Sequence, residues 1–171
     1  MINKENIKKI IIKKPLKLDC GETIVDYPLA YETYGILNEK KNNAILAFHA
    51  LTGDQFASGI NPITKKQGWW SYLVGPSKAI DTNKFFVICA NVIGGCMGSF
   101  GPGNINPKTN KEFGTDFPVI TINDMVNAQH NLLDFFKIDK LHSVIGGSMG
   151  GMQVLQFVAN FPNKTKTAIP I

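Results

Sequence analysis

The stretch VIGGSMGGMQVLQF, residues 144–157, runs from a short apolar segment through a glycine-rich turn into a segment with apolar residues at helical spacing. The spaced apolar residues are Met152, Val154, Leu155 and Phe157. The turn reads G-x-S-x-G, which is typical of a serine on a strained strand-to-helix corner at the top of a sheet. We therefore predict strand, tight turn and helix here, with Ser148 as a candidate nucleophile.

Outward from this corner, short and nearly all-apolar runs predict strands that are buried on both faces of a parallel sheet. They are residues Ala44–Ala50, Phe85–Val92, Ser143–Gly146 and Ala168–Ile171. Two amphipathic runs nearer the N-terminus, Lys14–Asp19 and Tyr27–Tyr34, indicate antiparallel strands at a sheet edge.

Helical segments separate the apolar runs. Asn123–Phe136 carries apolar residues along one side, with Thr121 or Asn123 as its N-cap, and a second helix follows Ser148 and stops near Phe161-Pro162. Strands that alternate with helices after an antiparallel start predict the α/β class, with a doubly wound sheet of mixed direction. The long irregular stretches, Leu51–Gly68 and Ile93–Pro118, are expected to be functional loops.

The bulk composition indicates one globular domain over residues 1–171, with 44% hydrophobic and 18% charged residues. No apolar run approaches the roughly 20 residues that a membrane helix needs, and Ile10–Ile12 is too short for a secretory signal, so we expect no membrane association and a cytoplasmic protein. Cys20, Cys89 and Cys96 lack metal-ligand spacing, which predicts reduced thiols and no metal site.

The net charge of +5 comes from lysines alone, since all 18 basic residues are lysine. A dedicated base reader is expected to carry arginine, whose planar fork contacts guanine, so we expect no nucleic-acid partner. A lysine-rich source composition explains the charge, and a patch that attracts an anionic substrate is the alternative.

A serine nucleophile needs a base to take its proton and N–H donors for the oxyanion that forms. One donor is the backbone N–H of Met149, the residue after the serine. We expect the second from the loop His49–Asp54, specifically the N–H of Leu51, so that Leu51→Ala has little effect. The alternative for the same turn is a phosphate cradle, although no G-x-x-x-x-G-K-[ST] pattern is present.

The general base is not evident in the sequence. His49 ends a predicted buried strand, where it is expected to be structural, and His130 lies in the middle of a predicted helix. In this fold class the acid and then the histidine follow the serine, yet residues 149–171 contain no Asp, Glu or His. We therefore expect the partners of Ser148 to lie outside this chain.

Several longer motifs resemble one family, the homoserine O-acetyltransferases of the α/β-hydrolase fold. Beyond GGSMGGMQVLQF, they are YPLAYETYG (27–35), HALTGD (49–54), GWWSYLVGPSKAIDTNKFFVICANVIGGCMGS (68–99), GP (101–102), INP (105–107) and FPVITINDMV (117–126). The resemblance covers about Leu16 to Ile171. Two departures are Phe100, where the family has GSTGP, and Asn123, where it has RDMV.

The resemblance implies ping-pong acyl transfer in methionine biosynthesis. Ser148 would take an acetyl group from acetyl-CoA and pass it to the hydroxyl of L-homoserine, and Leu51 and Met149 match the oxyanion-hole positions. Acetyl-CoA is then a co-substrate and no cofactor is bound. Because some relatives use succinyl-CoA, the acyl donor stays open. The resemblance is also compatible with a homodimer of the full-length family member.

The family's catalytic Asp and His, its lid and its C-terminal part follow the region matched by Ile171. We therefore expect an α/β-hydrolase sheet truncated after the elbow helix and one more strand, from a truncated or split reading frame, and inactive alone. The alternatives are one half of a split enzyme whose second chain supplies Asp and His, a non-catalytic interaction module, and a serine hydrolase of the same fold.

Overall fold

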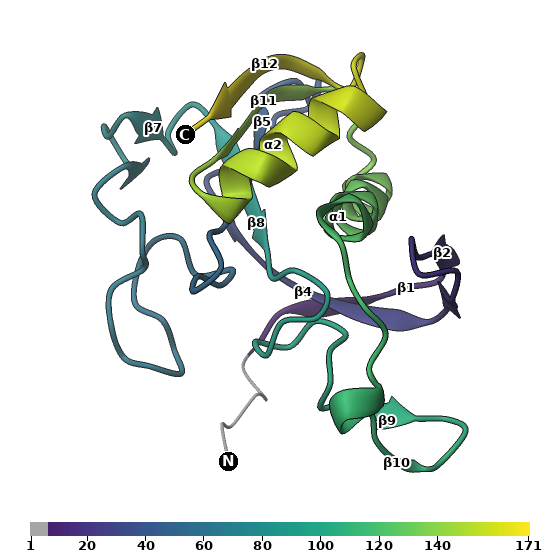
Figure 1. Ribbon diagram of the computed structural model, residues 1–171. Helices are drawn as coiled ribbons and strands as arrows, with labels where there is room; N and C mark the ends of the chain where they lie inside the picture. Colours follow the sequence, from purple (N-terminus) through teal and green to yellow (C-terminus); the bar gives the residue numbers. More distant parts are fainter. Residues whose placement is uncertain (1–6) are drawn as a thin grey trace.

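The computed structural model describes residues 7–171; residues 1–6 of the predicted domain lie outside the described part. Its two main helices and its central strands are drawn in Figure 1. The elements, in chain order, are β1 (Lys9–Ile12), β2 (Leu16–Lys17), β3 (Thr23–Ile24), β4 (Tyr27–Tyr34), β5 (Ala44–Phe48), β6 (Val74–Gly75), β7 (Ile80–Asp81), β8 (Phe86–Ala90), β9 (Ile105–Asn106), β10 (Lys111–Glu112), the 3-10 helix η1 (Gly114–Asp116), α1 (Ile122–Phe136), β11 (Leu141–Gly146), α2 (Met149–Asn160) and β12 (Thr165–Pro170).

Six strands form the central sheet in the order β1-β4-β8-β5-β11-β12. Strands β8, β5, β11 and β12 are parallel, whereas β4 is antiparallel to both of its neighbours. The predicted mixed and mostly parallel α/β sheet is therefore confirmed. In the register of β5 and β11, Phe48 lies opposite Gly146, so the loops that follow these two strands start side by side.

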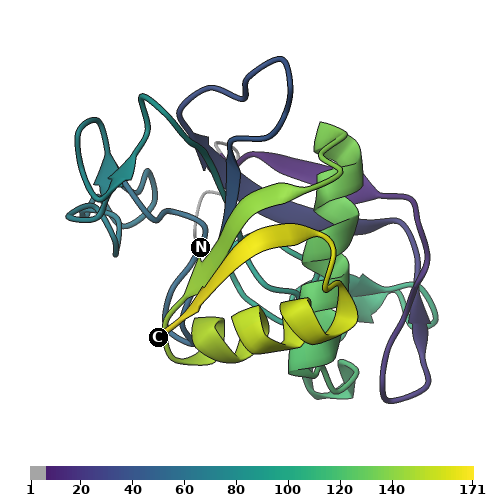
Figure 2. The same cartoon turned by 90° about the horizontal axis from the view of Figure 1, so that it is seen from above.

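Both faces of the sheet are covered at its centre. Helices α1 and α2 pack on one face over Leu46, Ile88 and Val144, and the segment between β5 and β8 covers the other face over Ile45 and Val87 (Figure 2). Because side chains alternate between faces along a strand, this double cover explains why β5 and β8 are apolar throughout. No helix in residues 7–171 is long and apolar enough to cross a membrane.

Helix α1 begins at a capping box. The Thr121 hydroxyl accepts from the backbone N–H of Asp124, and the Asp124 carboxylate accepts from the backbone N–H of Thr121. These two bonds satisfy donors that the first turn of a helix otherwise leaves free. Thr121, one of the two predicted candidates, is therefore the N-cap.

The prediction for the N-terminal strands was wrong in part. Tyr27–Tyr34 is a strand, but its antiparallel edge partner is Lys9–Ile12, and only Leu16–Lys17 of the run Lys14–Asp19 is extended. Leu16–Lys17 pairs instead with Thr23–Ile24 in a separate ribbon. Pro15 lies between β1 and β2 and has no N–H to donate to a sheet ladder, which separates these two strands.

The last predicted strand differs in burial. Strand β12 starts at Thr165, earlier than predicted, and most of its side chains are exposed, Ile169 by 45%. Within the described residues β12 is an edge of the sheet, paired only with β11. The apolar composition of Ala168–Ile171 predicts a strand buried on both faces, and this prediction is wrong because composition does not distinguish an edge strand from a central one.

Candidate active site

The turn between β11 and α2 holds Ser148 in a strained backbone conformation, with φ 56° and ψ −123°. A positive φ of this kind is uncommon for a residue with a Cβ and clusters at functional sites. The Ser148 side chain does not cap the helix, and the residue is exposed. Ser148 therefore lies exposed on a strained strand-to-helix corner, as the G-x-S-x-G pattern predicts.

Two glycines permit this corner to form. A Cβ on Gly146 would lie 2.5 Å from the carbonyl oxygen of Gly150, and a Cβ on Gly150 would lie 2.2 Å from the carbonyl oxygen of Phe48. Both distances are far below the contact that real Cβ atoms make. The first turn of α2 therefore lies directly against the end of β5, which only glycine at these positions allows.

Backbone hydrogen bonds fix the turn from the side of β12. The N–H of Ser148 donates to the carbonyl of Ile171 at 2.8 Å, and the N–H of Ile171 donates to the carbonyl of Gly146 at 2.9 Å. The N–H of Met152 in turn donates to the carbonyl of Ser148 at 3.1 Å. Ser148 is thus held on both sides by strand and helix backbone.

The two predicted oxyanion donors lie on the loops that leave this edge of the sheet. Met149 is the first residue of α2, so its N–H has no acceptor within the helix. Leu51 follows β5 by three residues, and its side chain is 77% exposed. The close approach of Gly150 to Phe48 and His49 brings the start of α2 against this loop. That these two N–H groups bind an oxyanion remains a prediction.

His49 is buried between the loops that follow β5 and β8, with 1% of its surface exposed. Its Nδ1 lies 2.7 Å from the carbonyl oxygen of Ala50, and its Nε2 accepts the backbone N–H of Val92 at 3.1 Å. These partners require a proton on Nδ1 and none on Nε2. Burial also lowers the pKa of His49, so the ring is neutral and structural, as predicted.

The other two histidines are engaged elsewhere. His130 of α1 stacks on Phe161 with ring centroids 3.9 Å apart, and His142, near the start of β11, packs on Phe85 at 4.8 Å. No histidine among residues 7–171 hydrogen bonds to the Ser148 hydroxyl. The described residues therefore present a candidate nucleophile and candidate donors, and none of their histidines is placed to act as its base.

The loop after β5 is fixed by a polar network around Asp54. Its carboxylate accepts from the N–H of Phe56 at 2.8 Å and from Asn61 Nδ2 at 2.9 Å, and its carbonyl accepts from Trp69 Nε1 at 2.8 Å. Gln55, fully buried, donates to the carbonyl of Met97 at 3.0 Å. The loops after β5 and β8 are therefore joined by side-chain bonds as well as by His49.

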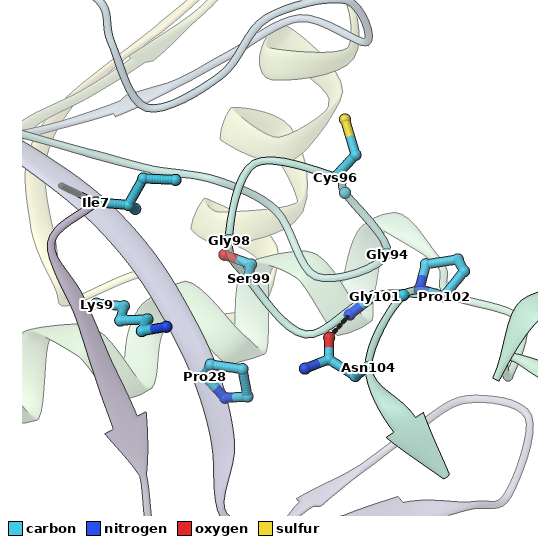
Figure 3. Close-up of a pocket in the computed structure, with 12 residues that line it drawn as sticks. Ile7, Lys9, Pro28, Gly94, Cys96, Gly98, Ser99, Gly101, Pro102 and Asn104 are labelled. Atoms are coloured by element: carbon cyan, nitrogen blue, oxygen red, sulfur yellow. Dashed lines mark hydrogen bonds between the residues drawn. The ribbon is translucent and has the colours of Figure 1, made fainter. Parts of the chain in front are cut away.

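The glycine-rich loop after β8 encloses a cavity of about 330 Å³ with β1 and β4. Figure 3 shows Lys9 and Pro28 on one side of it and the loop with Cys96, Ser99 and Asn104 on the other. Ser148, Leu51 and Met149 are not among its lining residues. This cavity is therefore separate from the serine corner in the described part of the chain.

Sequence reasoning missed two buried glutamines behind the corner, Gln129 in α1 and Gln153 in α2. The available signal was a polar residue on the buried side of each amphipathic helix, next to Ala128 and Val154. Such a residue is expected to have a specific hydrogen-bond partner.

Comparison with known proteins agrees with this architecture. The profile of the alpha/beta hydrolase fold family matches residues 43–169. A homoserine O-acetyltransferase of Pelagibacter ubique is 78% identical over 97% of this chain and 45% of its own length. The chain therefore spans somewhat less than half the length of this relative.

Two solved structures share the fold at lower identity. The homoserine O-acetyltransferase of Bacillus anthracis superposes with a TM-score of 0.86 at 36% identity, over 95% of this chain and 45% of that chain. Esterase E22 superposes with a TM-score of 0.83, also at 36% identity, over 94% of this chain and 46% of that chain. The same half-fold is therefore present in a transferase and in a hydrolase.

Proposed function

Because the chain belongs to the alpha/beta hydrolase fold family, we propose that it is the nucleophile-bearing part of a homoserine O-acetyltransferase. The observation that carries the proposal is the strained conformation of Ser148 at the start of α2, beside the loop of Leu51. The 78% identity to the Pelagibacter ubique protein supports the choice of substrates. As the family resemblance implies, the reaction belongs to methionine biosynthesis in the cytoplasm.

In the proposed reaction the Ser148 oxygen attacks the thioester carbonyl of acetyl-CoA while a base removes the hydroxyl proton. The carbonyl oxygen becomes an oxyanion that the N–H groups of Leu51 and Met149 stabilise. The carbon–sulfur bond then breaks, CoA leaves as the thiol with the proton from the base, and an acetyl ester remains on Ser148. The hydroxyl of L-homoserine attacks this ester by the same steps in reverse order and regenerates the serine.

The base and its carboxylate partner are proposed to come from polypeptide outside these 171 residues. Residues 149–171 contain no Asp, Glu or His, and the three histidines of the chain are engaged elsewhere. The source is either a continuation of the same chain or a second chain that pairs with the edge of β12. In either case the 171 residues alone are expected to turn over poorly, because loss of triad members costs several orders of magnitude in kcat.

Ester hydrolysis is the second candidate, and the similarity to esterase E22 favours it. Water would then replace homoserine in the second half of the reaction, with the same serine ester as intermediate. The identity to esterase E22 is 36%, compared with 78% to the Pelagibacter ubique transferase, so we place acyl transfer first.

The test joins residues 1–171 to the part of the Pelagibacter ubique relative that follows the matched segment; we call this fusion the completed chain. Release of free CoA from acetyl-CoA is followed by a thiol reagent with and without L-homoserine, and O-acetylhomoserine is measured by mass spectrometry. The same assay with succinyl-CoA identifies the donor. Ser148→Ala is the control.

We expect CoA release that depends on homoserine and is abolished in Ser148→Ala. CoA release at the same rate without homoserine, with acetate as the product, would instead establish hydrolysis. Normal transferase activity of Ser148→Ala would refute the nucleophile assignment.

A further inference from the structure

The side-chain amide of Gln153 joins the two backbone segments that carry the proposed oxyanion donors. Its Nε2 donates to the carbonyl of His49 at 3.3 Å and to the carbonyl of Met149 at 3.4 Å. His49 lies two residues before Leu51, and Met149 itself supplies the other donor. One buried NH₂ group therefore spans both sides of the proposed oxyanion hole.

The orientation of this amide is determined by its neighbours. Carbonyl oxygens accept only, so the NH₂ end of Gln153 must face His49 and Met149, and its oxygen must face away from them. The oxygen accepts from Nε2 of Gln129 in α1 at 2.7 Å. Gln129 and Gln153 are both fully buried.

This arrangement has a cost. The Oε1 atom of Gln129 is buried and has no hydrogen-bond partner within the described residues. An unsatisfied buried polar atom typically destabilises a protein by about 1–3 kcal/mol. An apolar pair would remove this penalty, but it would also remove the donor to the carbonyl of His49, so the amide pair is tied to the segment that precedes Leu51.

We propose that Gln153 is a positioning residue that sets the separation of the Leu51 and Met149 N–H groups, and that Gln129 holds the Gln153 amide in its working orientation. This inference rests on the proposed serine chemistry but not on the identity of the acyl acceptor. Gly150 permits the contact because it allows α2 to approach Phe48 and His49, and the Gln153 amide then fixes the two segments at that distance.

Oxyanion donors act mainly in the transition state, where the carbonyl oxygen carries charge. Misplacing them is therefore expected to lower kcat and leave KM for the acyl donor nearly unchanged. Displacements near 1 Å in a catalytic arrangement cost up to about 100-fold in rate, so we expect a loss of about 10- to 100-fold in Gln153→Met. Methionine keeps the length of the side chain and removes both donors.

The matched control is Gln156→Met in the completed chain. Gln156 is the same residue type on the same helix, and it bonds to Asn160 at 2.8 Å, away from His49 and Met149. The kcat of Gln156→Met is expected to equal that of the unmodified completed chain. Circular dichroism and thermal unfolding of each variant establish that it is folded before rates are compared.

The role of Gln129 is tested by a double-mutant cycle with Gln129→Met, Gln153→Met and the double variant. Gln129→Met is expected to lower kcat by a smaller factor, and the double variant is expected to be no slower than Gln153→Met. If the loss of kcat in the double variant equals the product of the two single losses, the two residues act independently, and the orienting role of Gln129 is overturned. A Gln153→Met rate within twofold of Gln156→Met would overturn the positioning role.

The burst of p-nitrophenol from p-nitrophenyl acetate gives a second readout, since it reports acetylation of Ser148 without CoA or homoserine. If the completed chain shows this burst but makes no O-acetylhomoserine, the proposed function fails while the positioning role is still tested on the burst rate. A burst unchanged by Gln153→Met contradicts the positioning role whatever the acceptor is.

Discussion

The close contact between α2 and β5 predicts a large effect of Gly150→Ala. The added Cβ would lie 2.2 Å from the Phe48 carbonyl oxygen, 0.8 Å short of the 3.0 Å below which real Cβ contacts essentially never fall. Both partners are backbone atoms of regular elements, so no flexible side chain can absorb the overlap. The start of α2 must move by roughly the same distance and carry the Met149 N–H with it.

A displacement near 1 Å of a catalytic donor costs up to about 100-fold in rate, and overpacking typically destabilises by about 1–3 kcal/mol. We therefore expect Gly150→Ala in the completed chain to slow the p-nitrophenyl acetate burst by about 100-fold and to lower the urea unfolding midpoint. Gly147→Ala is the matched control. A Cβ on Gly147 would lie 4.0 Å from the Cβ of Ile171, an ordinary van der Waals contact, so the burst rate of Gly147→Ala should be close to normal.

Two results would refute this reasoning. A normal burst rate in Gly150→Ala would mean that the position of α2 does not control Ser148 acetylation. Equal losses in Gly150→Ala and Gly147→Ala would mean that any added methyl group at the corner is harmful, whatever its distance from Phe48.

Three further predictions concern the stability of the completed chain. Burial lowers the pKa of His49 below its ordinary 6.5, so the unfolded state binds more protons than the folded state. The unfolding free energy should therefore fall as the pH drops through 6.5 towards the lowered pKa. In urea titrations at several pH values, the unfolding free energy of His49→Gln should depend less steeply on pH. Because Ser148 has φ 56°, the unfolding free energy of Ser148→Gly should exceed that of Ser148→Ala by about 1 kcal/mol, which raises the urea midpoint. Neither variant forms an acetyl-enzyme. Equal midpoints would contradict backbone strain at this position. Thr121→Ala removes the cap of α1 and should lower the unfolding free energy by about 1 kcal/mol in the same titration, whereas Thr121→Ser should not.

The elements that could be predicted from the sequence are those that local chemistry specifies. The glycines around Ser148, the apolar runs of β5 and β8, and the Thr121 cap each carry their own signal within a few residues. The start of the loop His49–Asp54 beside α2 also followed, because the loops after neighbouring parallel strands leave the same edge of the sheet.

What could not be predicted depends on contacts between distant segments. Lys9–Ile12 forms a strand because it pairs with Tyr27–Ala30, and the isoleucine run alone does not reveal that partner. The amide of Gln153 gains its role from His49, which is 104 residues away in the chain. Helical spacing also did not distinguish buried from exposed positions, since Met152 of α2 is 60% exposed.

The backbone pairing of Ile171 with both sides of the elbow has a consequence for the order of biosynthesis. A nascent chain emerges from its N-terminus, and its early segments fold first. The carbonyl that receives the Ser148 N–H, and the N–H that binds Gly146, belong to a residue made 23 positions after the serine. The corner is therefore completed only once Ile171 has been made, after β5, β8 and β11 already exist, so a nascent chain that ends before Ile171 lacks the two backbone bonds that hold Ser148 in its strained conformation.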